Sequence, residues 1–99
     1  MIQKNQNVRE IDSLTLLQFY AEWCAPCKMM MPVVNTLKEK LDDWLNVHQV
    51  DVDLHQELAV TYGIRSVPTF VVLKNNVEVW RSSGVLSEAA LEQKLISLQ

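Results

Sequence analysis

The sequence predicts one α/β domain, residues 1–99, with a central mixed sheet of about four strands flanked by helices. A chain of 99 residues is too short for a second hydrophobic core. Strand and helix patterns alternate along it, with no internal repeat or linker between them. A hairpin pattern after residue 68 requires two antiparallel strands. The expected order of elements is therefore β-α-β-α-β-β-α.

The first predicted strand and helix contain three unusual positions. The strand covers Leu14–Tyr20, an apolar run interrupted only by Gln18, as in a strand buried on both faces of a parallel sheet. After Trp23 the apolar positions follow the helical period. Pro26 suits the first turn of this helix, whereas Pro32 lies inside it and is expected to kink it by removing a backbone donor.

Alternation and capping signals predict the next two elements. Val47–Val52 alternates and is rich in β-branched residues, which predicts a second strand beside the first. A short helix is expected over Leu54–Tyr62, with Asp53 as its N-cap and Gly63 just past its end.

The C-terminal part predicts a hairpin followed by a helix. Two strands, Thr69–Leu73 and Val77–Trp80, flank the pair Asn75-Asn76, whose residues tolerate positive φ. Ser87 is expected to cap a final helix that runs to about residue 98.

Composition and charge exclude several classes of function. No apolar run approaches the roughly 18 to 20 residues that span a bilayer, and the N-terminal residues lack the apolar stretch of a signal peptide. Nine Lys and Arg against 12 Asp and Glu give a net charge of −3, with no basic run to neutralise phosphates. We therefore expect a cytoplasmic protein with no membrane and no nucleic-acid partner.

The only cysteines, Cys24 and Cys27, form a Cys-x-x-Cys pair where the first strand leads into the helix. Such a pair serves as half of a metal site or as a reversible dithiol. Only His48 and His55 could complete a zinc site, and their spacing is unlike that of a zinc module, so we expect no metal. Two buried structural cysteines are the other alternative, which this position and spacing disfavour.

Of the two thiols, Cys24 is predicted to be the exposed nucleophile. It precedes the first turn of the helix, where unpaired backbone N–H groups and the helix dipole favour a thiolate. The dipole alone could lower a thiol pKa from about 8.5 to about 7. Cys27 lies one turn inside the helix and is expected to resolve the mixed disulfide that Cys24 forms.

Two segments of the chain resemble the thioredoxins. Residues 21–29, Ala-Glu-Trp-Cys-Ala-Pro-Cys-Lys-Met, look like the active site of that family with Ala25 in place of the usual Gly. Residues 62–69, Tyr-Gly-Ile-Arg-Ser-Val-Pro-Thr, resemble the loop in which a cis-proline, here Pro68, lies opposite the cysteines. The resemblance extends over roughly residues 14–98 and implies a thioredoxin fold. Because only 17 residues precede Gln18, the N-terminal strand and helix are expected to be shortened.

The resemblance implies a thiol-disulfide oxidoreductase that reduces protein disulfides by dithiol exchange. Such a protein binds no cofactor and receives reducing equivalents from a thioredoxin reductase, so disulfide-containing targets and that reductase are the expected partners of a monomer. An extended target peptide would lie on an apolar platform and pair with backbone groups of the proline loop, as in strand addition. The residues implied for target binding are Trp23, Ala25, Pro26, Ile64, Val67, Pro68, Gly84 and Val85.

Two positions depart from the family pattern. Thioredoxins usually bury an Asp in the strand before the cysteines and a Lys in the neighbouring strand, where this chain has Gln18 and Gln49. An amide has no titratable proton to exchange with the resolving thiol, so water or another group must serve. We expect the two amides to hydrogen-bond, because an unpaired buried amide costs about 1–3 kcal/mol. These glutamines and Lys28 are the residues expected behind the cysteines.

Two other functions stay open at the level of sequence. The chain could be a non-catalytic thioredoxin-like partner that binds another protein, or assists its folding, through the same apolar face. It could also be a dithiol oxidant whose unstable disulfide drives exchange in the opposite direction. Met29 and Met31 could add a soft binding surface beside the thiols, although methionines more generally fill cores.

Overall fold

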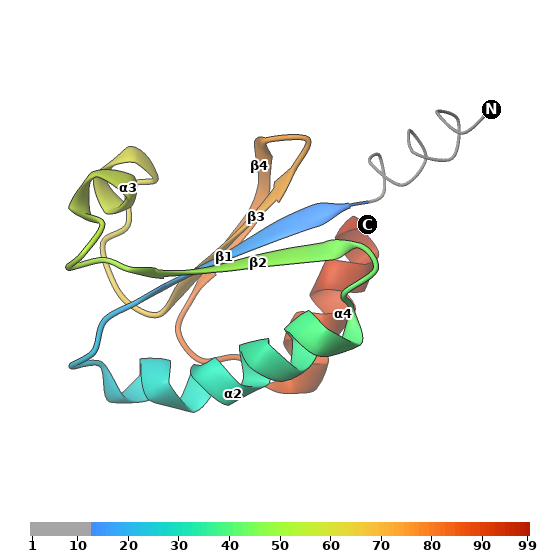
Figure 1. Cartoon of the computed structure of the whole chain (residues 1–99), viewed down its shortest axis with the longest axis horizontal. Helices are drawn as coiled ribbons and strands as arrows, with labels where there is room; N and C mark the ends of the chain where they lie inside the picture. The colour runs from blue at the N-terminus through green and yellow to red at the C-terminus, as the bar shows by residue number, and fades with distance from the viewer. Residues whose placement is uncertain (1–12) are drawn as a thin grey trace.

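The computed structural model describes residues 13–99, which form a four-stranded sheet with helices on both sides (Figure 1). The elements are β1 (Leu14–Tyr20), α2 (Ala25–Lys40), β2 (Leu45–Asp51), α3 (Gln56–Thr61), β3 (Thr69–Lys74), β4 (Val77–Ser83) and α4 (Glu88–Leu98). This order is the predicted one. The expected shortening of the N-terminal strand and helix concerns residues 1–12, which lie outside the described residues.

The sheet has the strand order β2-β1-β3-β4. β1 lies inside the sheet, parallel to β2 and antiparallel to β3, so the predicted pairing of the first two strands is confirmed. The parallel register places Gln18 directly beside Gln49. Because β1 and β2 are parallel, their carboxyl ends meet at one edge of the sheet, and α2 begins just beyond that edge (Figure 1).

The two faces of the sheet pack against different helices. α2 and α4 cover one face, and α3 lies on the other side (Figure 1). Successive strand side chains point to opposite faces, so Leu17 and Phe19 join a cluster with Tyr62, while Leu14 and Leu16 join the larger core. That core consists of Leu14, Leu16, Met30, Val34, Leu37, Leu41, Leu45, Phe70, Val72, Leu91 and Leu95. Gln18 is two residues after Leu16, so its side chain points to the same face as Leu14 and Leu16, the face that α2 covers.

Helix α2 begins and continues as its sequence predicts. Cys24 is the N-cap, Pro26 lies in the first turn and Pro32 lies inside the helix. Lys38 and Lys40 occupy the last turn, where positive charge complements the helix dipole. The kink expected at Pro32 stays a prediction. Within residues 13–99, none of the helices is long and apolar enough to cross a membrane.

The prediction that Asp53 caps α3 is wrong. The N-cap is His55, without a side-chain cap hydrogen bond, and the helix begins at Gln56. The carboxylate of Asp51 instead accepts the N–H groups of Asp53 and Leu54, at 2.8 and 3.3 Å. Asp53 and Leu54, which the sequence assigned to the cap and the first turn of α3, therefore belong to a turn that follows β2.

The hairpin turn and the last helix follow their local signals. Asn75 and Asn76 have φ of 54° and 67°, the left-handed conformation expected for a two-residue hairpin. The hydroxyl of Ser87 accepts the N–H of Ala90 at 3.1 Å and caps α4.

The positive φ of Asn76 gives a test of the hairpin. We predict that Asn76→Val lowers the free energy of unfolding by about 1–2 kcal/mol, because a β-branched side chain is strained at positive φ. Asn76→Gly should leave stability unchanged or raise it. Urea unfolding measures both variants. Asn46→Val, at an exposed position of β2, is the control, and a loss there as large as in Asn76→Val would contradict the explanation.

Candidate active site

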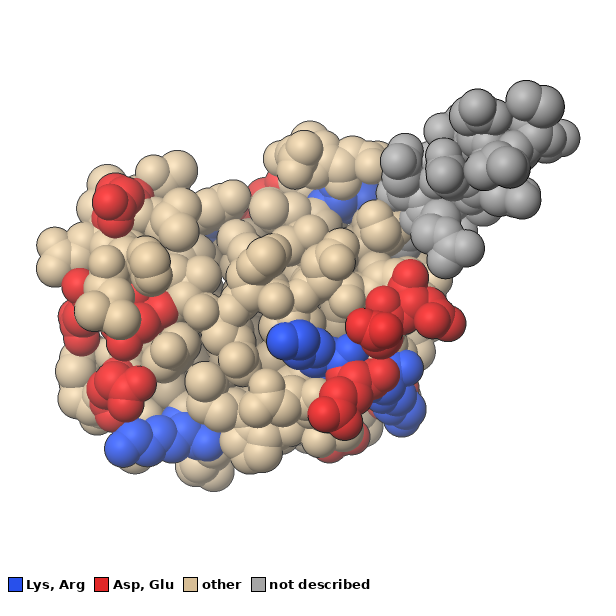
Figure 2. All heavy atoms as spheres, viewed as in Figure 1, with Lys and Arg blue, Asp and Glu red and all other residues tan. Residues whose placement is uncertain are grey.

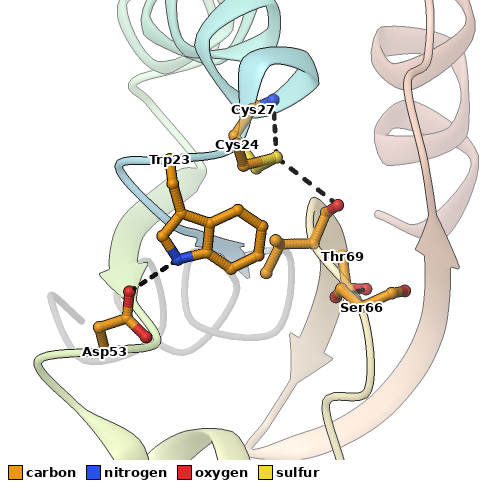
Figure 3. The surroundings of a disulfide bond; sticks show 7 residues. Trp23, Cys24, Cys27, Asp53, Ser66 and Thr69 are labelled. Atoms are coloured by element: carbon orange, nitrogen blue, oxygen red, sulfur yellow. Dashed lines mark hydrogen bonds between the residues drawn. A yellow bond between two sulfur atoms is a disulfide. The ribbon is translucent and has the colours of Figure 1, made fainter.

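Cys24 and Cys27 lie at the N-terminal end of α2 and form a disulfide, with their Cα atoms 5.2 Å apart (Figure 3). The N–H of Cys27 donates to Cys24 Sγ at 3.2 Å. This N–H is one of the helix donors with no intrahelical partner, so it favours negative charge on that sulfur. The sequence therefore placed Cys24 at the correct end of the helix, and its role as the nucleophile stays a prediction.

Cys24 is more buried than the sequence suggested. It is 4% exposed and Cys27 is 0% exposed, so Cys24 is the more accessible thiol but is not an exposed residue. The partly buried Val67 packs against the cluster that contains both cysteines. Only a small part of the Cys24 surface is therefore open to another molecule.

The proline loop faces Cys24 from across the site. The Val67–Pro68 peptide bond is cis, as expected from the resemblance. The carbonyl oxygen of Val67 lies 3.6 Å from Cys24 Sγ (Figure 3). In the reduced protein, the Cys24 thiol could donate to this oxygen.

Polar contacts at the ends of β3 and β4 hold this loop. The hydroxyl of Thr69 donates to the carbonyl oxygen of Ser66 at 2.8 Å and lies 2.9 Å from the hydroxyl of Ser83. The N–H of Gly84, whose φ is 97°, donates to the carbonyl oxygen of Pro68 at 2.8 Å. Sequence reasoning missed Thr69 and Ser83. The predicted hairpin alone could not have revealed this pair, because a register shift between Val72 and Leu73 brings Ser83 opposite Thr69.

Trp23 borders an apolar groove next to the active site. Its side chain is 72% exposed, and its indole N–H donates to the carboxylate of Asp53 at 3.0 Å (Figure 3). A cavity of about 150 Å³ lies beside it, lined by Trp23, Val52, Ala59, Ile64, Arg65, Ser66 and Val67. The structure thus joins the predicted residues Trp23, Ile64 and Val67 into one groove, and adds Asp53 as the residue that fixes the indole.

The other residues assigned to target binding are placed differently. Ala25 and Pro26 are exposed in the first turn of α2, and Val85 is half-exposed next to Gly84. Pro68 is buried, so its side chain is part of the loop's support and offers little surface to a target.

Charge surrounds the active-site end of the molecule. Figure 2 shows acidic side chains grouped at the end that carries α3, with a wide uncharged surface beside them. Glu22 before α2, Asp53 after β2 and Glu57 in α3 are all exposed. The groove is therefore largely apolar, with exposed carboxylates around it and one exposed cation, Arg65, on its wall.

An amide pair lies behind the cysteines. Gln18 is 0% exposed, and Gln49 Nε2 donates to its Oε1 at 2.9 Å, which confirms the predicted contact. Gln49 Nε2 also lies 3.4 Å from Asn35 Oδ1 and 3.9 Å from Met31 Sδ. Within residues 13–99, Gln18 Nε2 has no hydrogen-bond partner. Sequence reasoning missed Asn35, which is exposed on α2 and gave no signal of its own.

The three consecutive methionines have three different environments. Met30 belongs to the core, Met31 is half-buried beside Gln49, and Met29 is 64% exposed. Of the two that the sequence singled out, only Met29 offers a fully accessible side chain.

The two histidines lie apart from the cysteines. They line a cavity of about 430 Å³ between β2 and α3, together with Leu17, Leu58 and Tyr62, and neither cysteine borders it. In the part of the chain that the structure describes, no three His, Cys, Asp or Glu side chains are grouped to hold a metal ion.

Comparison with known proteins now identifies the family. The Thioredoxin family model matches residues 3–97. The chain belongs to the thioredoxin family. It is 40% identical over 82 residues to the thioredoxin of Bacillus subtilis (strain 168), covering 83% of this chain and 79% of that protein.

Solved thioredoxin structures agree with the observed fold. The germline-specific thioredoxin Deadhead of Drosophila melanogaster has a TM-score of 0.83 at 35% identity, covering 98% of this chain and 91% of that chain. A mutant thioredoxin from Halobacterium salinarum has a TM-score of 0.81 at 39% identity, covering 96% and 82%. The protein therefore has a thioredoxin fold and is a thiol-disulfide oxidoreductase that acts through Cys24 and Cys27.

The amide pair gives a test of the interior. We predict that Gln49→Leu lowers the free energy of unfolding by about 1–3 kcal/mol, because it leaves the oxygen of the buried Gln18 without a partner. The double variant Gln18→Leu/Gln49→Leu should lose less than Gln49→Leu alone, since it leaves no unpaired polar group there. Urea unfolding of the single and double variants measures this coupling. Asn35→Ala serves as the control with a small effect. A double variant that loses more stability than Gln49→Leu alone would contradict the pairing.

Proposed function

We propose that this protein works as a reductase of disulfides in other proteins, with Cys24 as the nucleophile and Cys27 as the resolving thiol. The observation that carries the proposal is the position of Cys24 Sγ. This sulfur is the more accessible of the pair, it accepts an N–H at the start of α2, and it faces the loop beside an apolar groove. A thiolate there is stabilised without a neighbouring base.

The reaction consists of two exchanges. The Cys24 thiolate attacks one sulfur of the target disulfide, so that a mixed disulfide forms and the second target sulfur leaves as a thiolate that takes a proton from solvent. The Cys27 thiolate then attacks Cys24 Sγ, which forms the Cys24–Cys27 disulfide and releases the first target sulfur, also protonated from solvent. Two electrons pass from the dithiol to the target.

The groove suits an extended target segment. Apolar side chains of Trp23, Ile64 and Val67 would contact its side chains, and backbone groups of Val67 would pair with its backbone. Ala25, Pro26 and the turn at Gly84 and Val85 would border the segment on the other side. Backbone pairing requires no particular target sequence, so we propose a broad range of targets.

The oxidised protein needs a two-electron donor to act again. We propose that a thioredoxin reductase supplies these electrons by disulfide exchange at Cys24, and that the protein itself carries no cofactor. We further propose that it acts as a monomer in the cytoplasm, where thiols are kept reduced.

Trapping of the intermediate tests the roles of the two thiols. Reduced Cys27→Ser should accumulate a mixed disulfide with a disulfide-containing protein, because the resolving thiol is absent. Non-reducing gel electrophoresis detects the adduct, which dithiothreitol should release. Cys24→Ser is the matched control and should trap little. Equal trapping by both variants would contradict the assignment of Cys24 as the nucleophile, and stronger trapping by Cys24→Ser would reverse it.

The reduction potential tests the direction of the reaction. We expect a value of about −270 mV, which is typical of reductases of this class. Equilibration of the Cys24–Cys27 couple with known ratios of reduced and oxidised glutathione measures it. A potential of about −120 mV would instead indicate a dithiol oxidant. A typical potential without any reduction of protein disulfides would favour a binding or folding-assistance partner.

A further inference from the structure

A second cavity borders the resolving cysteine. It has a volume of about 120 Å³ and is lined by Tyr20, Ala21, Glu22, Cys27, Lys28 and Met31. None of these residues lines the target groove. This volume has room for a few water molecules, and polar side chains on its walls can hold them. Cys27, which is 0% exposed, therefore borders a cavity that is separate from the groove beside Trp23.

The resolving step needs a group that favours the Cys27 thiolate. Gln18 and Gln49 are amides and exchange no proton in the working range of pH. Apart from Cys27 itself, three of the side chains that line the cavity have titratable protons: Tyr20, Glu22 and Lys28. Glu22 and Lys28 are exposed.

Tyr20 differs from the other two. It is half-buried, and it packs against the cluster formed by Ala21, Cys24 and Cys27. It also lies at the end of β1 on the same sheet face as Gln18, two residues away. Tyr20 is thus the titratable residue of the cavity wall that also packs against the cluster containing both cysteines.

The charges around Tyr20 keep its hydroxyl protonated. Burial raises the pKa of Tyr20, and the carboxylates of Asp51 and Glu22 raise it further because they oppose a second negative charge. Lys28 faces the same cavity from α2 with the opposite charge. Across the range in which thiols titrate, Tyr20 therefore remains an O–H donor, and a donor stabilises a thiolate.

We propose that Tyr20 is a positioning residue for the resolving step, whose hydroxyl donates through water in this cavity to the sulfur of Cys27 as it becomes a thiolate. This proposal deepens the reductase function and rests on it. In the step, the Cys27 thiol gives its proton to cavity water and then to solvent. Its sulfur bonds to Cys24 Sγ, and the target sulfur leaves as a thiolate. Tyr20 keeps its own proton throughout.

Tyr20→Phe removes the hydroxyl and keeps the ring. The reduced protein is mixed with Ellman's disulfide, which releases one coloured thiol when Cys24 attacks and a second when Cys27 resolves the adduct. We expect an unchanged first phase. The second phase should slow about threefold at pH 7, because a rise of one unit in the Cys27 pKa lowers the thiolate fraction about tenfold while raising its intrinsic reactivity about threefold.

The pH profile separates this role from a structural one. At a pH above the Cys27 pKa of both the wild type and Tyr20→Phe, this thiol is fully ionised in both proteins. The rate of the second phase in Tyr20→Phe should then equal or exceed the wild-type rate. A packing defect would slow it at every pH. Tyr62→Phe is the matched control, because Tyr62 lies in the cluster on the opposite sheet face against Phe19, with ring centroids 5.8 Å apart.

A second experiment changes the donor strength of the Tyr20 hydroxyl while keeping the tyrosine ring in place. The chain has two tyrosines, so Tyr62→Phe protein grown on fluorotyrosine is fluorinated at Tyr20 alone. The fluorinated phenol is the stronger donor and should speed the second phase at pH 7. Unchanged second phases in both the Tyr20→Phe and the fluorinated proteins would overturn the role of Tyr20 while leaving the reductase function intact. A wild type without any second phase would overturn the two-thiol reaction itself.

Discussion

The N-terminal end of α2 is the constraint on which the active site depends. Its free N–H groups favour negative charge on Cys24, so the thiol needs no separate base to become reactive. The helix end cannot drift, because Met30, Val34 and Leu37 further along α2 are buried against the sheet. Packing far from the cysteines thus sets the position of the sulfur to which a target must come.

The sheet brings the second half of the site to the same place. The proline loop enters β3, the antiparallel neighbour of β1, and hydrogen bonds from Thr69 and Gly84 hold it at the sheet edge. Val67 and Cys24 come from segments 43 residues apart, and neither could position the other by local structure. A target disulfide therefore meets two walls fixed by one sheet, which limits the motion lost on binding.

Local signals predicted most of the elements, and long-range contacts account for the misses. The bounds of β1, the cap at Ser87 and the hairpin turn all follow from neighbours in the sequence. The cap assigned to Asp53 failed because Asp51 organises that turn, which leaves the Asp53 carboxylate to accept the indole N–H of Trp23, 30 residues away. The burial of Cys24 likewise depends on tertiary packing, which no pattern near the cysteines could reveal.

The amide pair changes how the interior can respond to the reaction. Gln18 and Gln49 carry no charge in either redox state, so their contact adds no pH dependence to folding and cannot take up the proton of Cys27. A buried ion pair would need its charges kept matched during the reaction, because a lone buried charge is costly. In this chain the proton must leave toward water, and the cavity beside Cys27 is where water can approach that residue. The group that tunes the resolving thiol is therefore expected on the cavity wall, where Tyr20 at the end of β1 lies, and not in the amide pair.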